Sequence, residues 1–335
     1  MIREVYADCA ASAPVLPQLW DILRDRELAN PNATHFLGRK ARTMLEAARE
    51  HIAECIGADK PSEIAFTPSA TEACRIAINV MNIGWCSPYE HKAVHDHVEF
   101  CRAFGVVDDA TYAHMLLNNE TGARYDIDVK DWANTHRVFT DATAAVGQIP
   151  INVKELGVEA LAAGAHKFGG IPGIGFLYMK GGISDDDTYP GTPPVALAVA
   201  MSEALQYRTE HMYEDTERMQ SNIYRLGRDI TEIEGAHINT PIHAVRSILS
   251  VRFDGVNARE LLVSLDSLGV FASAGAACSA SADEPSRVLL ASGLTEEQAL
   301  STIRLSFCPE TPDVDFVYLA RALRLSVSKL RQLSQ

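Results

Sequence analysis

The stretch Gly164-Ala165-His166-Lys167-Phe168-Gly169-Gly170-Ile171-Pro172-Gly173 decides which fold the sequence predicts. It separates two short apolar runs, residues 156–163 and 174–179, and each run is bounded by Gly or Pro, which predicts two buried strands. A lysine amine in a low-dielectric pocket loses its proton more easily, and a neutral amine attacks carbonyl carbons. Lys167 is therefore a candidate Schiff-base lysine, and a solvated lysine on a surface turn is the competing interpretation.

The totals of the sequence narrow the class of protein. The chain has 335 residues, which favours two domains, and its 47% hydrophobic and 22% charged residues are ordinary for a soluble globular protein. The formal net charge of −14 argues against broad binding to nucleic acid. No apolar run approaches the roughly 20 residues that span a bilayer, and no secretory signal is recognisable. We therefore expect neither a nucleic acid nor a membrane as partner.

The cysteines point to a reducing compartment. There are seven, and no two form a C-x-x-C pair, so neither a disulfide framework nor a zinc knuckle is expected. Reduced thiols fit a cytoplasmic protein with no structural metal.

Strand and helix signals alternate from about residue 64 to about residue 201, which predicts an α/β layer with a mostly parallel sheet. An amphipathic helix over residues 36–56 is expected to end near Gly57. A long charged helix is expected over residues 202–233. The mixture of elements after it predicts a smaller α+β domain, with strands and helices at residues 247–253, 258–268, 287–292, 303–307 and 314–333.

Polar residues at the expected ends of strands are candidate ligand contacts. Ser69-Ala70-Thr71 stands between a strand and a helix, where backbone N–H groups bind phosphate, although an ordinary helix cap explains the same pattern. Asp141 ends an apolar strand, where open α/β sheets bind their ligands, and its carboxylate is suited to keeping a ring nitrogen protonated. A simple polar strand end is the alternative.

Three further residues are candidates for chemistry. His91, with His95 and His97, has the spacing of metal ligands, but such patterns are frequently false positives, and a solvated helix start or a ring stacked on a flat cofactor also explains it. Cys278 lies in a run of small residues, where a thiol is accessible enough to act as a nucleophile. Arg304 is a lone cation in an apolar strand, so it needs an anion, and a substrate carboxylate is one candidate.

These segments occur along nearly the whole chain in the order typical of one enzyme family. They are Asp8-Cys9-Ala10-Ala11-Ser12, Ser69-Ala70-Thr71-Glu72, Glu90-His91-Lys92-Ala93-Val94, Asn118-Asn119-Glu120-Thr121-Gly122, Asp141-Ala142-Thr143, Ala165-His166-Lys167, Gly191-Thr192, Cys278 and Ile303-Arg304. Together they resemble the motifs of the cysteine desulfurases of the NifS/IscS type, which belong to the class V aminotransferases.

The resemblance implies a pyridoxal-phosphate-dependent transferase of fold type I. It implies a large α/β domain over residues 13–224, with a mostly parallel sheet of the seven-stranded type. Residues 1–12 and 225–335 are expected to form a smaller α+β domain that carries the cysteine loop. The family resemblance also implies a homodimer with its sites at the interface.

The resemblance also implies the roles of site residues. Lys167 is expected to form the Schiff base with pyridoxal phosphate and to be the base at the substrate Cα, His91 to stack on the cofactor ring, and Cys278 to carry the persulfide. Arg304 and Asn119 are the expected substrate contacts. The other expected cofactor contacts are Asp141 at the ring nitrogen, with Ala70, Thr71, Asn119, His166 and Thr192.

The activity implied is conversion of L-cysteine to L-alanine with transfer of sulfur to an enzyme persulfide. The partner is a sulfur-acceptor protein, either an iron–sulfur scaffold or a sulfur carrier for thio-cofactor or tRNA synthesis. A selenocysteine lyase, a cysteine lyase or an epimerase of the same fold remains open, as does a non-catalytic homologue that acts as a partner. Two positions depart from the family pattern, since Ala144 replaces a usual Gln and Gly164 a usual Ser.

Overall fold

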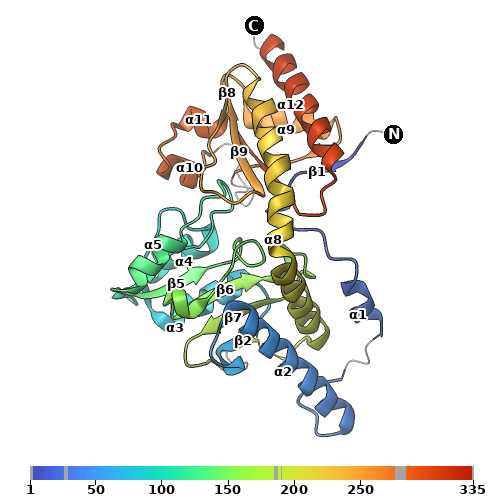
Figure 1. Cartoon of the computed structure of the whole chain (residues 1–335). Coiled ribbons are helices and arrows are strands. Elements are labelled where there is room, and N and C mark those ends of the chain that lie inside the picture. Colours follow the sequence, from blue (N-terminus) through green and yellow to red (C-terminus); the bar gives the residue numbers. More distant parts are fainter. Residues whose placement is uncertain (1–2, 26–28, 185–187, 190, 276–283, 334–335) are drawn as a thin grey trace. The chain divides into compact units, whose positions relative to one another are not determined.

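The computed structural model describes residues 3–25, 29–184, 188–189, 191–275 and 284–333, so Cys278 lies outside the described residues. The chain divides into two compact units (Figure 1). The large unit comprises Ala13–Leu117 and Tyr125–Met212, and the small unit comprises Met1–Ser12, Asn118–Arg124 and Tyr213–Gln335. These units divide at Met212/Tyr213, inside one helix, and the domain boundary expected after residue 224 stays a prediction.

The large unit contains a six-stranded sheet in the order β2-β7-β6-β5-β4-β3. Strands β3 to β6 are parallel to one another, while β7 is antiparallel to both β2 and β6, so β2 has the direction of β6. The bounds are β2 Ile64–Thr67, β3 Ile83–Cys86, β4 Asp108–Ala113, β5 Arg137–Asp141, β6 Ala160–Gly164 and β7 Gly175–Met179. The expected mostly parallel sheet is confirmed.

The number of strands differs from the seven-stranded type that the family resemblance implies. The described residues form six, and the sheet ends at β3, whose Trp85 is exposed. No apolar run of the sequence predicted a seventh strand, so the expectation of seven strands rested on the family resemblance alone.

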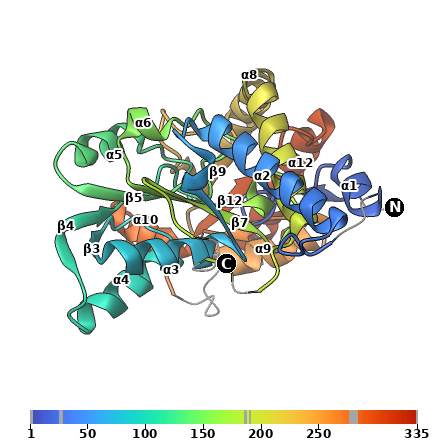
Figure 2. The same cartoon turned by 90° about the horizontal axis from the view of Figure 1, so that it is seen from below.

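The central strands are apolar on both faces because helices cover both sides of the sheet. All residues of β6 and β7 are buried, which explains their continuous apolar runs. Helices α3 (Ala70–Met81) and α4 (Lys92–Ala103) lie side by side (Figure 2). The remaining elements of the large unit are α1 Leu19–Asp25, α2 Phe36–Ile56, η1 Pro61–Glu63, α5 Asp126–Ala133, α6 Val153–Leu156 and η2 Ala165–Lys167.

Local capping explains where the elements begin and end. Helix α2 has the predicted bounds, and Gly57 ends it in the left-handed region at φ 70°. The strand expected from residue 156 begins later, because Asn152 caps the short helix α6 by accepting hydrogen bonds from two backbone N–H groups. Helix α8 (Val195–Thr231) begins earlier than the expected residue 202.

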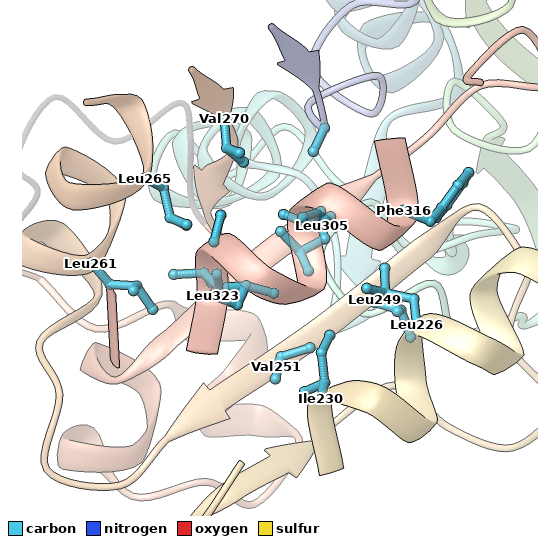
Figure 3. Packing of buried hydrophobic residues seen from close by; sticks show 14 of the residues in the cluster. Leu226, Ile230, Leu249, Val251, Leu261, Leu265, Val270, Leu305, Phe316 and Leu323 are labelled. Atoms are coloured by element: carbon cyan, nitrogen blue, oxygen red, sulfur yellow. The ribbon is translucent and has the colours of Figure 1, made fainter. Parts of the chain in front are cut away.

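The small unit is built on an antiparallel sheet in the order β11-β12-β9-β8 and a two-stranded parallel pair, β1 with β10. Its core gathers Leu226 and Ile230 of α8, Val251 of β9, Leu305 of β12 and Leu323 of α12 (Figure 3). The bounds are β1 Val5–Tyr6, β8 Ala236–Ile238, β9 Ile248–Phe253, α9 Ala258–Asp266, β10 Val270–Phe271, β11 Ser273–Ala274, α10 Arg287–Ala291, α11 Glu296–Leu300, β12 Thr302–Ser306 and α12 Asp313–Leu333.

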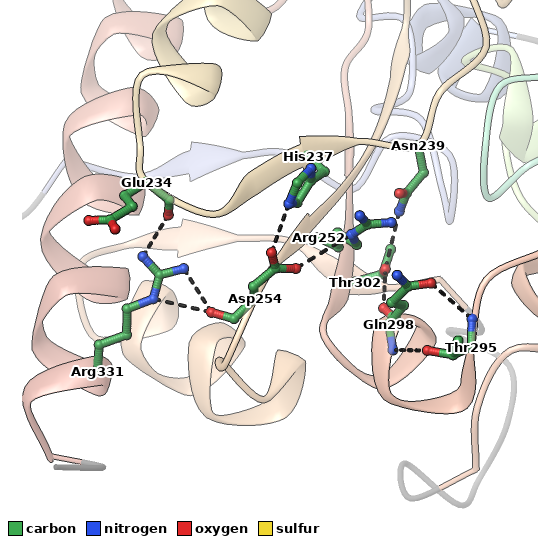
Figure 4. A network of polar contacts seen from close by, with 9 residues as sticks. All are labelled: Glu234, His237, Asn239, Arg252, Asp254, Thr295, Gln298, Thr302 and Arg331. Carbon is green, nitrogen blue, oxygen red and sulfur yellow. Dashed lines mark hydrogen bonds and ion pairs between the residues drawn. The ribbon is translucent and has the colours of Figure 1, made fainter.

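A polar network fixes the end of α12 to the turn that follows β9 (Figure 4). Arg331 donates from Nη2 to the Asp254 carbonyl at 2.8 Å and from Nη1 to the Glu234 carbonyl at 2.6 Å. The hydrogen bond from His237 to the Asp254 carboxylate, 2.8 Å long, lowers the pKa of that carboxyl group. No helix in the described part of the chain combines the length and apolar character that crossing a membrane requires.

Candidate active site

The predicted groups of the large unit lie at one edge of its sheet. Strands β2, β3, β4, β5 and β6 point the same way, so their carboxyl ends share an edge, which is where open α/β sheets bind ligands. The predicted residues at or just after these strand ends are Ser69, Ala70 and Thr71 after β2, His91 after β3, Asp141 on β5, and His166 and Lys167 after β6.

The start of α3 is a site at which an anion would be stabilised. Ser69 adopts an extended conformation, and its hydroxyl oxygen accepts a hydrogen bond from the Glu72 N–H at 3.2 Å, so it caps the helix. Ala70 is buried and Thr71 is exposed. Both the capping and the phosphate interpretations of this segment are compatible with these positions, because a cap of this kind leaves the first-turn N–H groups available.

Two glycines let the start of α3 approach the sheet closely. Gly164 of β6 pairs with Gly175 of β7. A Cβ at Gly175 would lie 2.8 Å from the carbonyl carbon of Ser69, and one at Gly164 would lie 3.1 Å from the Cβ of Ala70 and 3.3 Å from the His166 ring. The usual Ser of the family would therefore require its neighbours to shift by a few tenths of an ångström here.

Asp141 and Thr143 supply polar atoms inside an apolar layer. Asp141 is 6% exposed, and its Oδ1 accepts a hydrogen bond from the Thr143 N–H at 2.9 Å. The Thr143 hydroxyl is buried and has no hydrogen-bond partner among the described residues. A buried hydroxyl without a partner is costly, so it marks a position where a polar ligand would be stabilised.

His166 and Lys167 lie on the short helix η2, directly after β6. The Gly170 N–H donates to the Ala165 carbonyl at 2.9 Å and so closes the turn, while the Ala13 N–H donates to the His166 carbonyl at 2.8 Å. Burial, together with the nearby Lys167 charge, lowers the pKa of His166 to about 4. Its imidazole is therefore neutral at pH 7 and is able both to donate and to accept a hydrogen bond.

Arg208 of α8 holds this turn in place, and no sequence pattern predicted that role. It is 4% exposed, and its Nε donates to the Phe168 carbonyl at 3.2 Å. Gly169, next in the chain, has φ +88° and lies so close that a Cβ there would be 3.2 Å from Arg208 Nη2. The sequence around Arg208 is that of an ordinary charged helix, so no local signal identified it.

His91 begins α4 and is not part of a metal cluster in the described chain. Its Nδ1 accepts a hydrogen bond from the Ala93 N–H at 3.2 Å, so the neutral ring carries its proton on Nε2. His95 contacts Asp96 and His97 contacts Asn79 instead. Within the described ranges, no three His, Cys, Asp or Glu side chains gather as metal ligands would. His91 therefore stands at the helix start, as one interpretation expects, and its stacking on a flat cofactor stays a prediction.

Thr192 lies in the turn that precedes α8. Thr192 is exposed, and Gly191 before it has φ +108°, a conformation that favours glycine.

In the small unit, Arg304 binds Asn119 and also Asp8, which the sequence did not predict as its partner. Arg304 on β12 is 2% exposed, donates from Nη2 to Asp8 Oδ1 at 2.6 Å, and donates from Nη1 to the Asn119 carbonyl at 3.0 Å. The chain itself therefore supplies an anion to Arg304. Its Nε is buried and has no hydrogen-bond partner within the described residues.

A tight turn fixes the position of Asn119. The side-chain oxygen of Asn118 accepts hydrogen bonds from the Glu120 N–H at 3.0 Å and the Thr121 N–H at 2.9 Å, and Gly122 follows at φ +74°. The Glu120 carboxylate in turn accepts a hydrogen bond from the Ser286 hydroxyl at 2.5 Å. These bonds hold the Asn119 carbonyl where Arg304 reaches it.

Comparisons with known proteins agree with the motif pattern. The family model "Aminotransferase class-V" matches residues 5–99, 108–186 and 184–317. The chain is 31% identical over 383 residues to "Cysteine desulfurase IscS" of Dictyoglomus turgidum, covering 100% of this chain and 97% of that protein.

Solved structures agree as well. A "NIFS-LIKE PROTEIN" matches with a TM-score of 0.87 and 25% identity, covering 98% of this chain and 100% of the other. The structure "SspA in complex with cysteine" matches with a TM-score of 0.77 and 26% identity, covering 92% of this chain and 100% of the other. The resemblance stated from the motifs is confirmed, and the chain belongs to the class V aminotransferase family.

Proposed function

We propose that this protein is a pyridoxal-phosphate-dependent cysteine desulfurase, which converts L-cysteine to L-alanine and transfers the sulfur to Cys278 as a persulfide. The observation that carries the proposal is the position of Asp141, His166 and Lys167 at the carboxyl ends of the neighbouring parallel strands β5 and β6. The start of α3 lies beside them, as the close approach of Ala70 to Gly164 indicates. The similarity to a cysteine desulfurase and to a cysteine-bound structure supports the choice of substrate.

The residues at this edge have the chemistry that the cofactor needs. Lys167 would hold it covalently, the first-turn N–H groups of Ala70 and Thr71 would bind its phosphate, and the neutral His166 would add a hydrogen bond. The unpartnered Thr143 hydroxyl supports the fit, since a polar ligand would satisfy it. Pyridoxal phosphate, when bound, supplies an electron-withdrawing ring that stabilises negative charge at the substrate Cα.

Asp141 is assigned to the pyridine nitrogen. A buried carboxylate that faces a ring nitrogen favours the protonated ring, because the two opposite charges stabilise each other where water does not screen them. Its burial and its fixed hydrogen bond from Thr143 support this role.

Lys167 and His91 are assigned to proton movement and ring stacking. Lys167, once its amine is free, would remove and return the proton at the substrate Cα. His91 would stack on the cofactor ring. Its hydrogen bond to the Ala93 N–H leaves the proton on Nε2, from which it would be passed on.

Arg304 is assigned to the substrate carboxylate, with Asn119 as a second contact of substrate and cofactor. The guanidinium has five N–H donors in a planar fork, so it is able to bind more than the one carboxylate of Asp8. The buried Nε, for which the described residues offer no acceptor, supports the assignment.

In the proposed reaction, Cys278 is the first acceptor of the substrate sulfur. The Cys278 thiolate attacks the substrate sulfur, the carbon–sulfur bond breaks, and the three-carbon amino acid takes up a proton and leaves as alanine. Cys278 lies outside the described residues, so its role rests on the motif. A sulfur-acceptor protein would then receive the persulfide sulfur.

The assembly and location complete the proposal. A homodimer would let the exposed Thr192 reach the cofactor phosphate bound in the partner subunit. A large domain over residues 13–224 and a small domain from residues 1–12 and 225–335 remain the proposed division. The described cysteines that are free thiols suit a cytoplasmic protein.

Incubation of the purified protein with L-cysteine and a thiol reductant tests the function. We expect equal amounts of alanine and sulfide, and Cys278→Ser should abolish both while leaving the cofactor bound. Cys55→Ser, at a half-buried cysteine of α2, is the matched control and should retain activity. Activity with selenocysteine alone would favour a lyase, and absence of any turnover by a cofactor-loaded protein would contradict the proposal.

A further inference from the structure

Two cysteines from opposite ends of the chain meet in the small unit. Asp8 and Ser306 form a parallel β-bridge, and the Cys9 N–H donates to the Ser306 carbonyl at 3.2 Å. The Ala10 N–H also donates, to the Ser306 hydroxyl at 2.9 Å. These bonds hold the segment that contains Cys9 against the segment that leads to Cys308.

The two thiols are close enough for each to shift the pKa of the other, and the two residues are 5% and 7% exposed. The Cys308 sulfur also lies 3.6 Å from the Thr311 hydroxyl, whose oxygen accepts a hydrogen bond from the Cys308 N–H at 3.3 Å. The β-bridge and the two hydrogen bonds to Ser306 already hold the segments of Cys9 and Cys308 together, which favours a bond between their sulfurs.

The interaction between the two thiols gives their sulfurs different pKa values. The hydrogen bond from Cys9 lowers the pKa of Cys308, although burial opposes this, and the same bond together with burial raises the pKa of Cys9. Burial raises the pKa of Cys55, Cys74 and Cys101 instead. Since the thiolate is the reactive form, Cys308 is the better nucleophile of this pair.

We propose that Cys9 and Cys308 are a reversible redox site, which closes to a disulfide when the protein meets a peroxide. The Cys308 thiolate attacks one peroxide oxygen, the O–O bond breaks, and the departing hydroxide takes a proton to become water. Cys9 then gives up its proton and attacks the sulfenic sulfur of Cys308, so that the S–S bond forms and a second water leaves. The two thiols lose two electrons in total, and the peroxide gains them.

The place of the pair in the fold gives the modification a structural consequence. Cys9 follows Asp8, whose carboxylate binds Arg304 at 2.6 Å. A disulfide would join the segment after β1 covalently to the loop between β12 and α12. The proposed redox step uses neither Cys278 nor the reaction assigned to it.

Peroxide treatment of the purified full-length chain tests the proposal without relying on activity. After treatment, free thiols are alkylated, the protein is digested, and the peptides are mapped by mass spectrometry. We expect a peptide pair joined through Cys9 and Cys308, lighter by about 2 Da than the sum of the reduced peptides, which dithiothreitol separates. Cys9→Ser and Cys308→Ser should each lose the cross-link, and Cys55→Ser should keep it.

The unmodified chain gives the decisive result, so a variant that fails to fold does not remove the test. Cys9→Ala serves as a second variant should Cys9→Ser be unstable. Alkylation of both cysteines after peroxide treatment would overturn the proposal. Separate oxidation of each to the sulfinic acid without a cross-link, or a cross-link of either one to a different cysteine, would overturn it as well.

Discussion

Asp141 and Lys167 of the large unit owe their positions to the ends of neighbouring parallel strands, whereas Arg304 of the small unit owes its position to direct bonds with Asp8 and Asn119. In the first group the sheet does the positioning, and each residue follows its own strand. In the second group three segments far apart in the sequence hold one another through an ion pair and a hydrogen bond. The first arrangement is predictable from local patterns, and the second requires knowing which distant segments meet.

The energetics of the two regions differ in the same way. Burial is the main cause of the low pKa of His166, next to Lys167, and keeps its imidazole neutral. Arg304 is almost fully buried and charged, so its stability depends on the partner that the chain provides. Substitutions at the strand ends should therefore affect the cofactor and the chemistry, while substitutions in the ion pair should first affect folding.

Lys167→Ala should have the largest effect. Without the amine, neither covalent attachment of the cofactor nor proton transfer at the substrate Cα is available, so we expect turnover of L-cysteine to fall at least about 1000-fold. The visible absorbance of the bound cofactor should disappear with it. Lys180→Ala is the matched control, because Lys180 is exposed and follows β7 at the opposite edge of the sheet. Normal turnover by Lys167→Ala would contradict the role given to Lys167 at the strand ends of the large unit.

Asp8→Asn should be the next largest, and it acts on stability. It leaves the buried Arg304 without its carboxylate, so we expect the free energy of unfolding to fall by about 3 kcal/mol in urea titrations. Asp21→Asn breaks an exposed ion pair with Arg24 and should cost less than about 1 kcal/mol. Equal losses in the two variants would show that Arg304 does not depend on Asp8.

Gly164→Ser tests how tightly the start of α3 approaches the sheet. The added Cβ would lie 3.1 Å from the Cβ of Ala70, so we expect a loss of about 1–2 kcal/mol in the free energy of unfolding. Ala70→Gly in the same chain removes the nearest contact and should recover part of that loss, in excess of what Ala70→Gly does alone. An additive double variant would mean that these two residues do not crowd each other.

The titration of His166 should leave stability at pH 7 unchanged and affect it only at acid pH. His166 has a pKa of about 4 in the folded chain and a higher value when unfolded, so the unfolded chain binds the extra proton between about pH 6.5 and about pH 4. The free energy of unfolding should therefore fall as the pH drops through that window and show no contribution from His166 above it.

His166→Gln should flatten this part of the pH profile, as measured by urea unfolding at a series of pH values. His51→Gln, at an exposed position on α2, should leave the profile unchanged. In the wild type, NMR titration of the His166 ring should show protonation only near pH 4, and a midpoint near 6.5 would contradict the proposed burial effect.

The sequence predicted those parts of the fold whose cause is local. The bounds of α2 follow from an amphipathic pattern and the glycine that ends it, and the apolar runs of β7 and β9 predicted buried strands. The start of the strand expected from residue 156 was wrong because a cap at Asn152 gave preference to a short helix.

The parts of the candidate site that escaped prediction depend on contacts between distant residues. Arg304 was expected to need an anion, but no local pattern pointed to Asp8 as that anion. Arg208 was missed because it bonds a backbone carbonyl of a turn on another element. The catalytic and binding roles given to the site residues remain predictions, because they depend on contacts with the bound cofactor and substrate.

The most direct test of the central claim is to trap the cofactor on its lysine. The purified protein, loaded with pyridoxal phosphate, is reduced with borohydride, digested and mapped by mass spectrometry. Our account predicts a single phosphopyridoxyl adduct, on Lys167, and its loss in Lys167→Ala. An adduct on another lysine of a protein that still turns over cysteine, or no adduct at all, would contradict the account.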